Sequence, residues 1–225
     1  MLARVFSPIR AIIARIAIAI TKLYGYGAQF GRPRVRPKPV KIAMVSHTLP
    51  PSFSGQAIII HRLLCDLGPE SYCLISNRAE GIEGFSNEYL SPLPGPRYQI
   101  AQETKFWRAF VVGMHHVNML IGVLQRARFI AGVLRRENSN VVVAWTGDVL
   151  DLPAGYIASR LVGASYYVYI QDHYSKREFI DPVAREWATR LEPWLIRNAT
   201  GIIVANETLR DDLRNQYGVE PNVIH

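Results

Sequence analysis

Four short groups of polar residues follow predicted buried strands, and they are the first candidates for a functional site. The groups occupy residues 52–56, 146–148, 171–174 and 206–207. In a parallel sheet the carboxyl ends of the strands meet along one edge, and ligands bind just beyond that edge. We therefore expect side chains from these groups to line a binding site.

Asp172 and His173 offer the clearest acid–base chemistry. A carboxylate and an imidazole stand side by side directly after an apolar segment, and a neutral imidazole can accept or donate a proton near pH 7. Both are therefore candidate catalytic residues. The alternative is a surface turn in which Asp172 caps the segment that follows.

The residues Ser54, Gly55 and Gln56 precede a predicted helix. Backbone N–H groups at a helix start favour a phosphate or hydroxyl group, and a glycine lets a ligand approach the backbone closely. These three residues are candidate binding residues. A strand-to-helix turn that needs glycine for its φ angle would give the same pattern.

Thr146 and Asp148 follow another predicted strand, and Asn206 and Glu207 follow a third. Asp148 could accept hydrogen bonds from ligand hydroxyl groups, or it could cap the helix predicted to begin at Asp151. Glu207 is more typical of a helix start than of a ligand contact. All four are candidates for substrate binding.

No metal site is predicted. His115 and His116 are adjacent, and adjacent residues on a helix point about 100° apart, so they cannot face one ion together. The chain has no DxD sequence, and its two cysteines, Cys65 and Cys73, lack the spacing of a zinc site. Each cysteine lies in an apolar stretch, so both are expected to be buried free thiols.

The elements that must position these residues alternate between strand and helix from residue 41 onward. Strands are predicted at 41–47, 71–76, 140–145, 165–171, 201–205 and, at its start only, 223–224. Helices are predicted at 57–67, 103–137, 151–162, 181–198 and 208–217, with a break in the second near Gly113 or Gly122. Residues 77–99 look irregular, with one short strand near 89–90. This alternation predicts an α/β domain over 41–225 with a doubly wound, mainly parallel, Rossmann-like sheet.

The positive charge is concentrated at the amino terminus. Residues 1–40 contain eight Lys and Arg side chains and no Asp or Glu, which equals the whole formal net charge of +8. The globular part is therefore neutral, and no nucleic-acid partner is expected for it. Any anionic partner should meet the arm, which we divide into a basic amphipathic helix, 1–31, and a Pro- and Arg-rich linker, 32–40.

A helical wheel of residues 2–24 places the large apolar side chains on one arc and the basic ones on the opposite arc, with Ile18 as the exception on the polar side. Arg10 and Arg15 interrupt the apolar run, which argues against a transmembrane span or a signal peptide. A helix lying on an anionic membrane surface fits the pattern. The alternative is a helix that packs on the domain's own surface or on a partner domain.

The globular part resembles the N-terminal domain of the family 4 glycosyltransferases, which have the GT-B fold. After the first strand, Pro50-Pro51 and then Ser54-Gly55 stand where that family has its glycine loop, usually with two adjacent glycines. The end of the chain is similar, in order and spacing, to the family's segment that leads to the interdomain crossover. The similar segments are 191–209, 217–218 and 223–224.

The resemblance implies a hexosyltransferase-like enzyme in which this chain supplies the acceptor side. The nucleotide-sugar donor would bind a second, C-terminal domain, His173 would contact the transferred sugar, and the reaction would need no metal ion. Because the crossover is expected at 223–225, the donor half is expected to be missing from this chain. We therefore expect the chain alone to be inactive.

Two functions are consistent with these features. The first is the acceptor-side domain of a glycosyltransferase for lipid-linked or envelope polysaccharide, peripheral on the cytoplasmic face of the plasma membrane. The second is a non-catalytic, membrane-associated binding module or subunit. A third, an unrelated flavodoxin-like or nucleotide-binding domain, is disfavoured because the chain lacks GxGxxG and Walker patterns.

Overall fold

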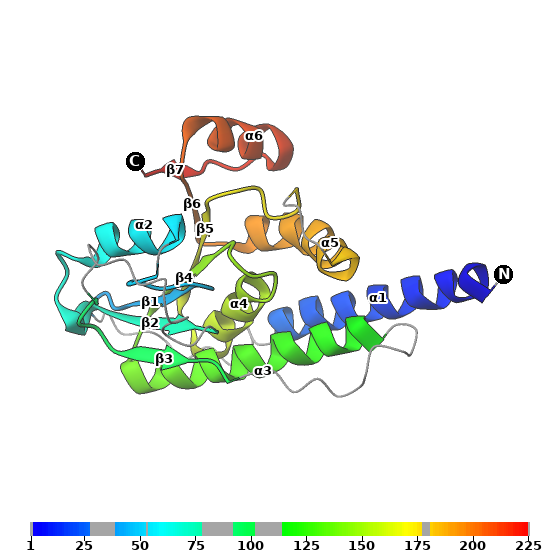
Figure 1. Ribbon diagram of the computed structural model, residues 1–225, viewed down its shortest axis with the longest axis horizontal. Coiled ribbons are helices and arrows are strands. Elements are labelled where there is room, and N and C mark those ends of the chain that lie inside the picture. Colours follow the sequence, from blue (N-terminus) through cyan, green and yellow to red (C-terminus); the bar gives the residue numbers. More distant parts are fainter. Residues whose placement is uncertain are drawn as a thin grey trace.

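The computed structural model describes residues 2–27, 39–52, 54–77, 92–101, 114–176 and 181–224, with side chains from residue 10 onward. The helices are α1 (Leu2–Gly27), α2 (Gly55–Leu64), α3 (Met114–Glu137), α4 (Asp151–Val162), α5 (Pro182–Asn198), α6 (Glu207–Tyr217) and a short 3₁₀ helix, η2 (Pro69–Ser71). The strands are β1 (Ile42–Val45), β2 (Tyr72–Ser76), β3 (Arg97–Gln99), β4 (Val141–Trp145), β5 (Ser165–Ile170), β6 (Gly201–Val204) and β7 (Asn222–Val223). Figure 1 shows these elements in space.

Within the described ranges, seven strands form one sheet in the order β3-β2-β1-β4-β5-β6-β7. Every neighbouring pair is parallel. The order reverses between β1 and β4, where Ala43 lies beside Val142. A reversal of this kind leaves a crevice at the carboxyl ends of the two strands, where ligands bind in open α/β sheets. The predicted parallel, Rossmann-like sheet is confirmed.

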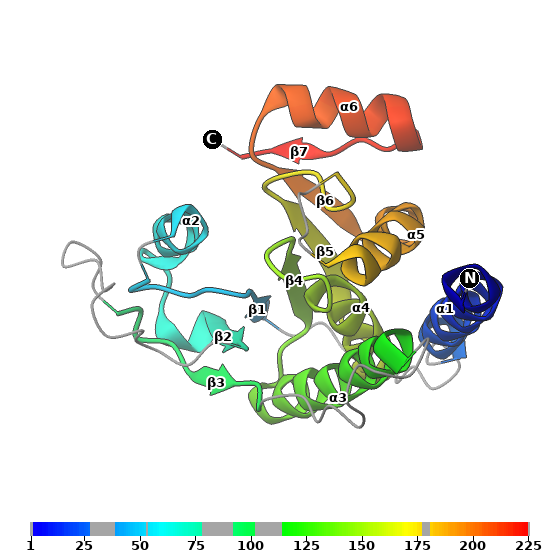
Figure 2. The same ribbon diagram turned by 45° about the vertical axis from the view of Figure 1, so that its right-hand side comes forward.

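Successive strand residues face opposite sides of the sheet and enter two separate hydrophobic cores. In β1, Ala43 and Val45 belong to the core beneath α3, α4 and α5, whereas Met44 belongs to the core beneath α2. In that second core the rings of Trp145 and Tyr169 stack with their centroids 3.7 Å apart. Figure 2 shows α2 on one side of the sheet and α3, α4 and α5 on the other. The fold is therefore doubly wound, and strands covered on both faces are apolar throughout.

Helix ends follow the local signals in the sequence. The side chains of Ser54, Asp181 and Asn206 accept backbone N–H hydrogen bonds at the starts of α2, α5 and α6. Gly163 and Gly218 end α4 and α6 with left-handed φ angles of 75° and 67°, which glycine adopts without steric penalty. The predicted helix ends at these two glycines are confirmed.

One local prediction about the elements was wrong, and one of two alternatives for another is excluded. Strand β3 lies inside the segment 77–99 that looked irregular, and it extends the edge of the sheet beside β2. Helix α3 continues through Gly122 without a break, because Gly122 is buried in the packed face of the helix and packing outweighs its low helix propensity. The possible break at Gly113 and the short strand near 89–90 lie outside the described residues.

The two cysteines have different environments. Cys73 is a buried free thiol in β2, as predicted, and burial raises its pKa to about 11. Cys65 is exposed, so its predicted burial was wrong. It forms the C-cap of α2, one position beyond the last residue that packs on the sheet.

Helix α1 packs on the domain through a face that the helical wheel did not single out. Ala17 and Ile18 are buried in the core shared with α3, α4 and α5, so the exception on the wheel is a core residue. Gly25 approaches α4 and α5 so closely that a Cβ there would lie 2.8 Å from the Tyr156 ring and 3.0 Å from the Trp194 ring. The domain's own surface is thus the partner of one face of α1.

Among the described helices, α3 alone is long and apolar enough to cross a membrane by length and composition. Core helices of soluble proteins meet the same criterion. Residues of α3 such as Val123, Ile130 and Leu134 are buried against the sheet and its neighbouring helices. We therefore interpret α3 as a core helix.

Candidate functional site

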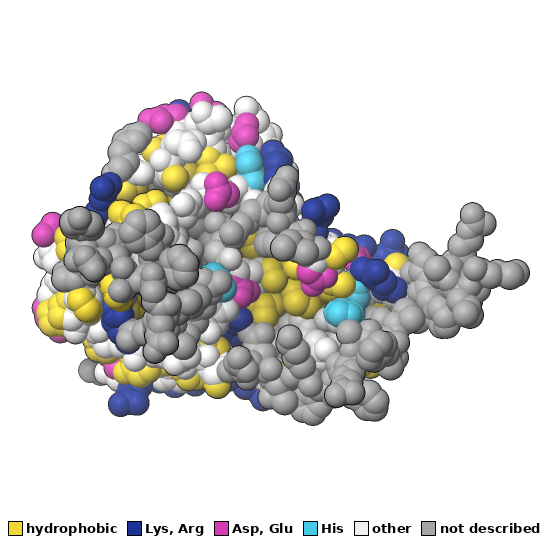
Figure 3. Space-filling model, in the orientation of Figure 1, with side chains coloured by type: hydrophobic (Ala, Val, Ile, Leu, Met, Phe, Trp, Pro, Cys, Tyr) yellow, Lys and Arg dark blue, Asp and Glu magenta, His cyan; other side chains and the backbone are white. Residues whose placement is uncertain are grey.

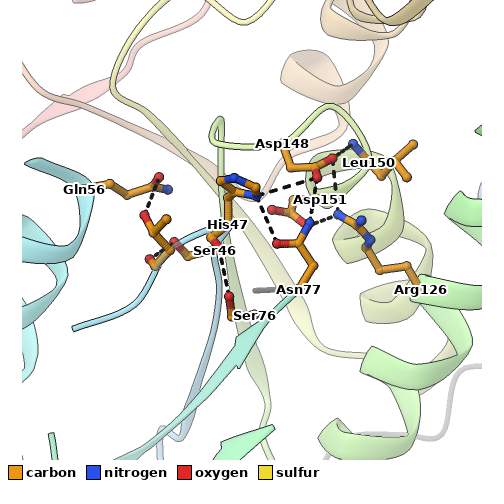
Figure 4. A network of polar contacts seen from close by, with 10 residues as sticks. Ser46, His47, Gln56, Ser76, Asn77, Arg126, Asp148, Leu150 and Asp151 are labelled. Atoms are coloured by element: carbon orange, nitrogen blue, oxygen red, sulfur yellow. Dashed lines mark hydrogen bonds and ion pairs between the residues drawn. The ribbon is translucent and has the colours of Figure 1, made fainter. Parts of the chain in front are cut away.

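The carboxyl edge of the sheet carries a row of three polar side chains from three neighbouring strands. His47 follows β1, Asn77 follows β2 and Asp148 follows β4. The Asn77 amide nitrogen donates to Asp148 Oδ2 at 2.7 Å, and His47 Nδ1 lies 3.0 Å from Asn77 Oδ1. Figure 4 shows this row converging where the strand order reverses. The row therefore lies in the crevice that the topology predicts.

The row fixes which nitrogen of the imidazole carries a proton. The amide oxygen of Asn77 can only accept, so Nδ1 of His47 must be the donor. In the neutral ring the lone pair is then on Nε2. Asp148 Oδ2 lies 3.8 Å from His47 Nδ1, close enough to stabilise an imidazolium ion. With 29% of its side chain exposed, His47 is accessible to a ligand.

Arg126, which forms a buried ion pair with Asp151, holds the Asp148 carboxylate on the side away from Asn77. Arg126 of α3 places Nη1 3.3 Å from Asp148 Oδ1 and also contacts Asp151, the first residue of α4. The backbone N–H of Leu150 donates to Asp148 Oδ1 at 2.8 Å. These contacts fix the carboxylate that orients Asn77. Asp148 therefore binds the backbone of Leu150 within the β4–α4 turn, while its other oxygen faces the site; the N-cap of α4 is Leu150, so Asp148 is not the N-cap of that helix.

The β1–α2 loop forms the neighbouring wall of the site. Thr48 Oγ1 lies 2.9 Å from Ser54 Oγ and 3.4 Å from Gln56 Oε1. Ser54 also accepts from the backbone N–H of Ala57, which makes it the N-cap of α2. Its hydroxyl is thus engaged in holding the loop, whereas the half-buried Gln56 lies beside Gly147 of the β4–α4 turn.

Gly55 is the first residue of α2 and is exposed. Among the described residues, positive φ angles in glycine occur at Gly163 and Gly218. Gly55 therefore does not serve a left-handed turn, which was the alternative explanation for it. A Cβ at Gly55 would lie 3.6 Å from the side-chain nitrogen of Gln171, so the start of α2 faces the end of β5.

Thr146 joins the ends of β4 and β5. Its Oγ1 accepts from the backbone N–H of Gln171 at 3.3 Å, and its own N–H donates to the carbonyl of Tyr169 at 3.2 Å. Only 3% of Thr146 is exposed. It therefore positions the two strand ends, and the half-buried Asp148 nearby is better placed to meet a ligand.

Asp172 and His173 lie on the segment after β5, but they do not act on each other. His173 Nε2 is 3.0 Å from Oδ2 of Asp212 in α6, and Asp172 is exposed. The next residue, Tyr174, is buried and its hydroxyl donates to the carbonyl of Val149. Burial raises the pKa of Tyr174 well above its ordinary value, so it stays a neutral anchor of this segment.

Asn206 and Glu207 begin α6. Asn206 Oδ1 accepts from the backbone N–H of Leu209 at 2.9 Å, and Glu207 is the exposed first residue of the helix. The helix-start interpretation of Glu207 agrees with this position. Both residues lie at the carboxyl end of β6, beside the segment that carries His173.

The predicted residues thus fall into two groups along one edge of the sheet. One surrounds β1 and β4, and the other surrounds the ends of β5 and β6. Around the first group the structure adds four residues that were not among the predicted candidates: His47, Asn77, Arg126 and Asp151. Asn77 follows β2 directly and His47 comes two residues after β1, so the strand-end rule could have found them. Nothing local marks Arg126, which reaches the site from the middle of a helix.

No known protein-family model matches the sequence, and no curated protein matches it either. The likeness to family 4 glycosyltransferases therefore stays a prediction from the residues themselves. Within the described part of the chain, no group of three or more His, Cys, Asp or Glu side chains could hold a metal ion.

Proposed function

We propose that this chain is the acceptor-side domain of a nucleotide-sugar-dependent glycosyltransferase. The observation that carries the proposal is the row of His47, Asn77 and Asp148 in the crevice between β1 and β4. A sugar presents many hydroxyl groups, each a donor and an acceptor, and this row offers an imidazole, an amide and a carboxylate in alternation. The acceptor is a sugar or lipid-linked sugar used in lipid-linked or envelope polysaccharide synthesis on the cytoplasmic face of the membrane.

In this proposal His47 is the general base. The acceptor hydroxyl gives its proton to Nε2 of His47, and its oxygen forms a bond to the anomeric carbon of the donor. The bond between that carbon and the nucleoside diphosphate breaks, and the electron pair leaves with the nucleoside diphosphate. Asp148 stabilises the imidazolium through its 3.8 Å approach to Nδ1. His173 and Asp172, further along the same edge after β5, contact the transferred sugar.

The nucleotide-sugar would bind a second domain. The ends of β5 and β6, with Asn206 and Glu207, would face that domain. No cofactor is required of this chain, and no metal-dependent step is invoked. Transfer by the isolated chain is expected to be undetectable, whereas the acceptor should still bind to it.

A non-catalytic sugar-binding module is the second candidate. It is favoured by one observation: His173 is already engaged by Asp212 at 3.0 Å, which leaves this candidate catalytic group bound within the chain. Such a module would recruit a separate catalytic subunit through the same edge of the sheet.

Binding of sugar to the isolated chain tests both candidates against an unrelated function. We would record saturation-transfer difference NMR spectra with the methyl pyranosides of glucose, mannose, galactose and N-acetylglucosamine. At least one should give a signal that disappears in His47→Ala and in Asn77→Leu. His115→Ala is the matched control, because His115 is an exposed histidine on α3, away from the row, and it should keep the signal.

Equal signals from His47→Ala and His115→Ala would overturn the assignment of the site, and so would the absence of signal from every pyranoside. Catalysis is tested separately, by adding a donor-binding domain and a radiolabelled nucleotide-sugar. Transfer that survives His47→Ala would remove the general-base role, and no transfer by any combination would favour the binding module.

A further inference from the structure

Helix α1 presents an exposed apolar stripe on the side that faces away from the domain. The stripe consists of Ile12, Ile16, Ile20 and Leu23, of which 55%, 54%, 40% and 67% are exposed. The spacing of four, four and three residues keeps these side chains on one face of the helix. Soluble surfaces rarely leave large aliphatic side chains exposed in a contiguous row. We call this row the α1 stripe.

The other face of α1 is fixed to the protein. Ala14, Ala17 and Ile18 are between 0% and 4% exposed, and the buried Thr21 hydroxyl donates to the carbonyl of Ala17 at 3.0 Å. The close approach of Gly25 to α4 and α5 leaves no room for a larger residue. Because small residues hold α1 against three helices, the α1 stripe is a rigid part of the domain and not a mobile tether.

Helices α1 and α3 pack side by side and together extend past the carboxyl edge of the sheet, where the candidate site lies; we call this pair the helical ledge, and the α1 stripe lies along it. Helix α3 ends at the amino edge, where Lys41 Nζ donates to Glu137 Oε2 at 2.7 Å just before β1. Arg126 of the same helix already reaches Asp148 at the carboxyl edge. At 1.5 Å per residue, the part of α3 before Arg126 continues about 18 Å further.

The amino-terminal half of α1 accompanies this part of α3. Helix α1 packs against α3. Burial lowers the pKa of His116 near the start of α3, the charge of Glu186 opposes this, and the charge of Arg10 on α1 lowers it. Trp187 of α5 donates to His116 Nδ1 at 3.0 Å, which joins α5 to the ledge. Figure 1 shows α1 and α3 side by side, reaching beyond the sheet.

The charge around the α1 stripe is positive. Arg15 and Lys22 flank it on one side, and no acidic residue occurs in residues 1–40. On α5, Arg190 acts electrostatically on Lys22, but it is itself paired with Glu186 at 2.9 Å, so the positive charge beside the stripe comes from α1. Figure 3 shows Lys and Arg side chains where α1 and α5 lie side by side. An apolar row flanked by cations is typical of helices that bind anionic membrane surfaces.

A second copy of the chain is a poorer occupant for the same surface. Pairing two stripes would bring Arg15 and Lys22 of each copy close to those of the other. Since residues 1–40 contain no carboxylate to compensate, the paired helices would repel each other.

We propose that the α1 stripe is a rigid docking surface for an anionic lipid membrane, and that it holds the carboxyl edge of the sheet beside the lipid headgroups. The helix lies in the interface and does not span the bilayer. Membrane docking does not require sugar transfer. The further step, that docking brings a lipid-linked acceptor to the site, rests on the proposed function.

Vesicle co-sedimentation of the full chain tests the proposal. The native chain should pellet with vesicles of phosphatidylcholine and phosphatidylglycerol, and much less with phosphatidylcholine alone. The double variant Ile12→Asp and Ile16→Asp should reduce partitioning at least about tenfold, because two apolar side chains are replaced by anions. Deletion of α1 is avoided, since it would uncover the core around Ile18.

Matched controls come from exposed residues elsewhere. Leu67→Asp replaces an apolar residue that is 38% exposed and lies outside residues 1–40, and it should leave binding within about twofold, whereas Ile16→Asp alone should weaken it clearly. Arg15→Glu should weaken binding to anionic vesicles severalfold, whereas Arg62→Glu on α2 should not. Equal loss in test and control variants, or native binding that ignores phosphatidylglycerol, would overturn the proposal.

Orientation is tested with a fluorophore on a single thiol. Ile16→Cys in a Cys65→Ser background should be quenched by brominated lipid, whereas the native exposed Cys65 should not be. Quenching at both positions, or at neither, would contradict a fixed orientation. A dimer seen by light scattering in the native chain, lost in the Ile12→Asp and Ile16→Asp variant and accompanied by no vesicle binding, would identify the stripe as a dimer seam instead.

Discussion

Arg126 and Asp151 form an ion pair that lies buried beneath the candidate site, with 2% and 1% of their side chains exposed. The pair joins the middle of α3 to the first turn of α4, and the same guanidinium contacts Asp148 at 3.3 Å. A buried pair contributes little compared with apolar residues of the same size, but removal of one partner leaves a buried charge uncompensated. This difference gives a sharp test of the arrangement.

Replacing Arg126 with Met should lower the free energy of unfolding by about 3–5 kcal/mol, because Asp151 would lose its buried partner. Urea unfolding followed by circular dichroism measures the change. Arg128→Met is the control, since Arg128 is exposed on the same helix, and it should change stability by about 0.5 kcal/mol or less. The double variant Arg126→Met with Asp151→Leu should recover part of the loss, and a double variant no more stable than Arg126→Met would contradict this account.

Gly147 allows the β4–α4 turn to lie against the β1–α2 loop. A Cβ at this position would be 2.7 Å from Gln56 Oε1 and 2.8 Å from the Cβ of His47. Gly147→Ala should therefore push the two walls of the site apart and destabilise the chain by about 1–3 kcal/mol. Thermal unfolding should show a lower Tm, by about 2–4 °C for each kcal/mol in a chain of this size.

Gly132 provides the contrasting substitution. It lies within α3, and a Cβ there would meet no atom within 4 Å. Gly132→Ala should therefore be neutral or stabilise the chain by up to about 1 kcal/mol, since alanine favours helix. If both alanine variants unfolded at the same temperature, the close approach at Gly147 would lose its support.

Most of the fold could be predicted because its signals are local. Apolar runs bounded by turn residues gave the strands that are covered on both faces, and Gly163 and Gly218 gave two helix ends. The face of α1 that packs on the domain could not be predicted. Its contact residues are small, such as Ala17 and Gly25, and a wheel of hydrophobicity gives more weight to the large exposed isoleucines.

The candidate site was predicted only in part, for a related reason. The strand-end rule placed the candidates, Asp148 and Gln56 among them, along the carboxyl edge of the sheet, and the structure brings these two to the β1–β4 part of that edge. It could not tell that the polar partner of His173 would be Asp212, which comes from α6. Nor could it find Arg126, because a buried arginine in a helix depends on carboxylates that only the tertiary fold brings to it.

The two thiols should react at very different rates. Cys65 is exposed, whereas Cys73 is buried and its pKa is raised to about 11 by burial. A thiolate is the reactive species, so Cys73 should be almost fully protonated and inert near pH 8. Titration of the native chain with Ellman's reagent should give one fast thiol, and titration in urea should give two. A fast thiol that persists in Cys65→Ser would show that β2 is more accessible than the structure indicates.

Glu137 should make stability depend on pH in the acid range. Its carboxylate accepts hydrogen bonds from Lys41 at 2.7 Å and from the Tyr98 hydroxyl, and these contacts hold its pKa below the ordinary 4.5. A lowered pKa means that the stabilising contribution is complete above about pH 4.5 and is lost as the pH falls through the folded-state value. Glu137→Gln should therefore cost about 1–2 kcal/mol at pH 7, and urea unfolding at successive pH values should show this difference shrinking toward zero in acid. Glu70→Gln, at an exposed position, should differ from the native chain by about 0.5 kcal/mol or less throughout. A constant difference for Glu137→Gln from pH 7 into the acid range would mean that the ionised carboxylate is not what stabilises this edge.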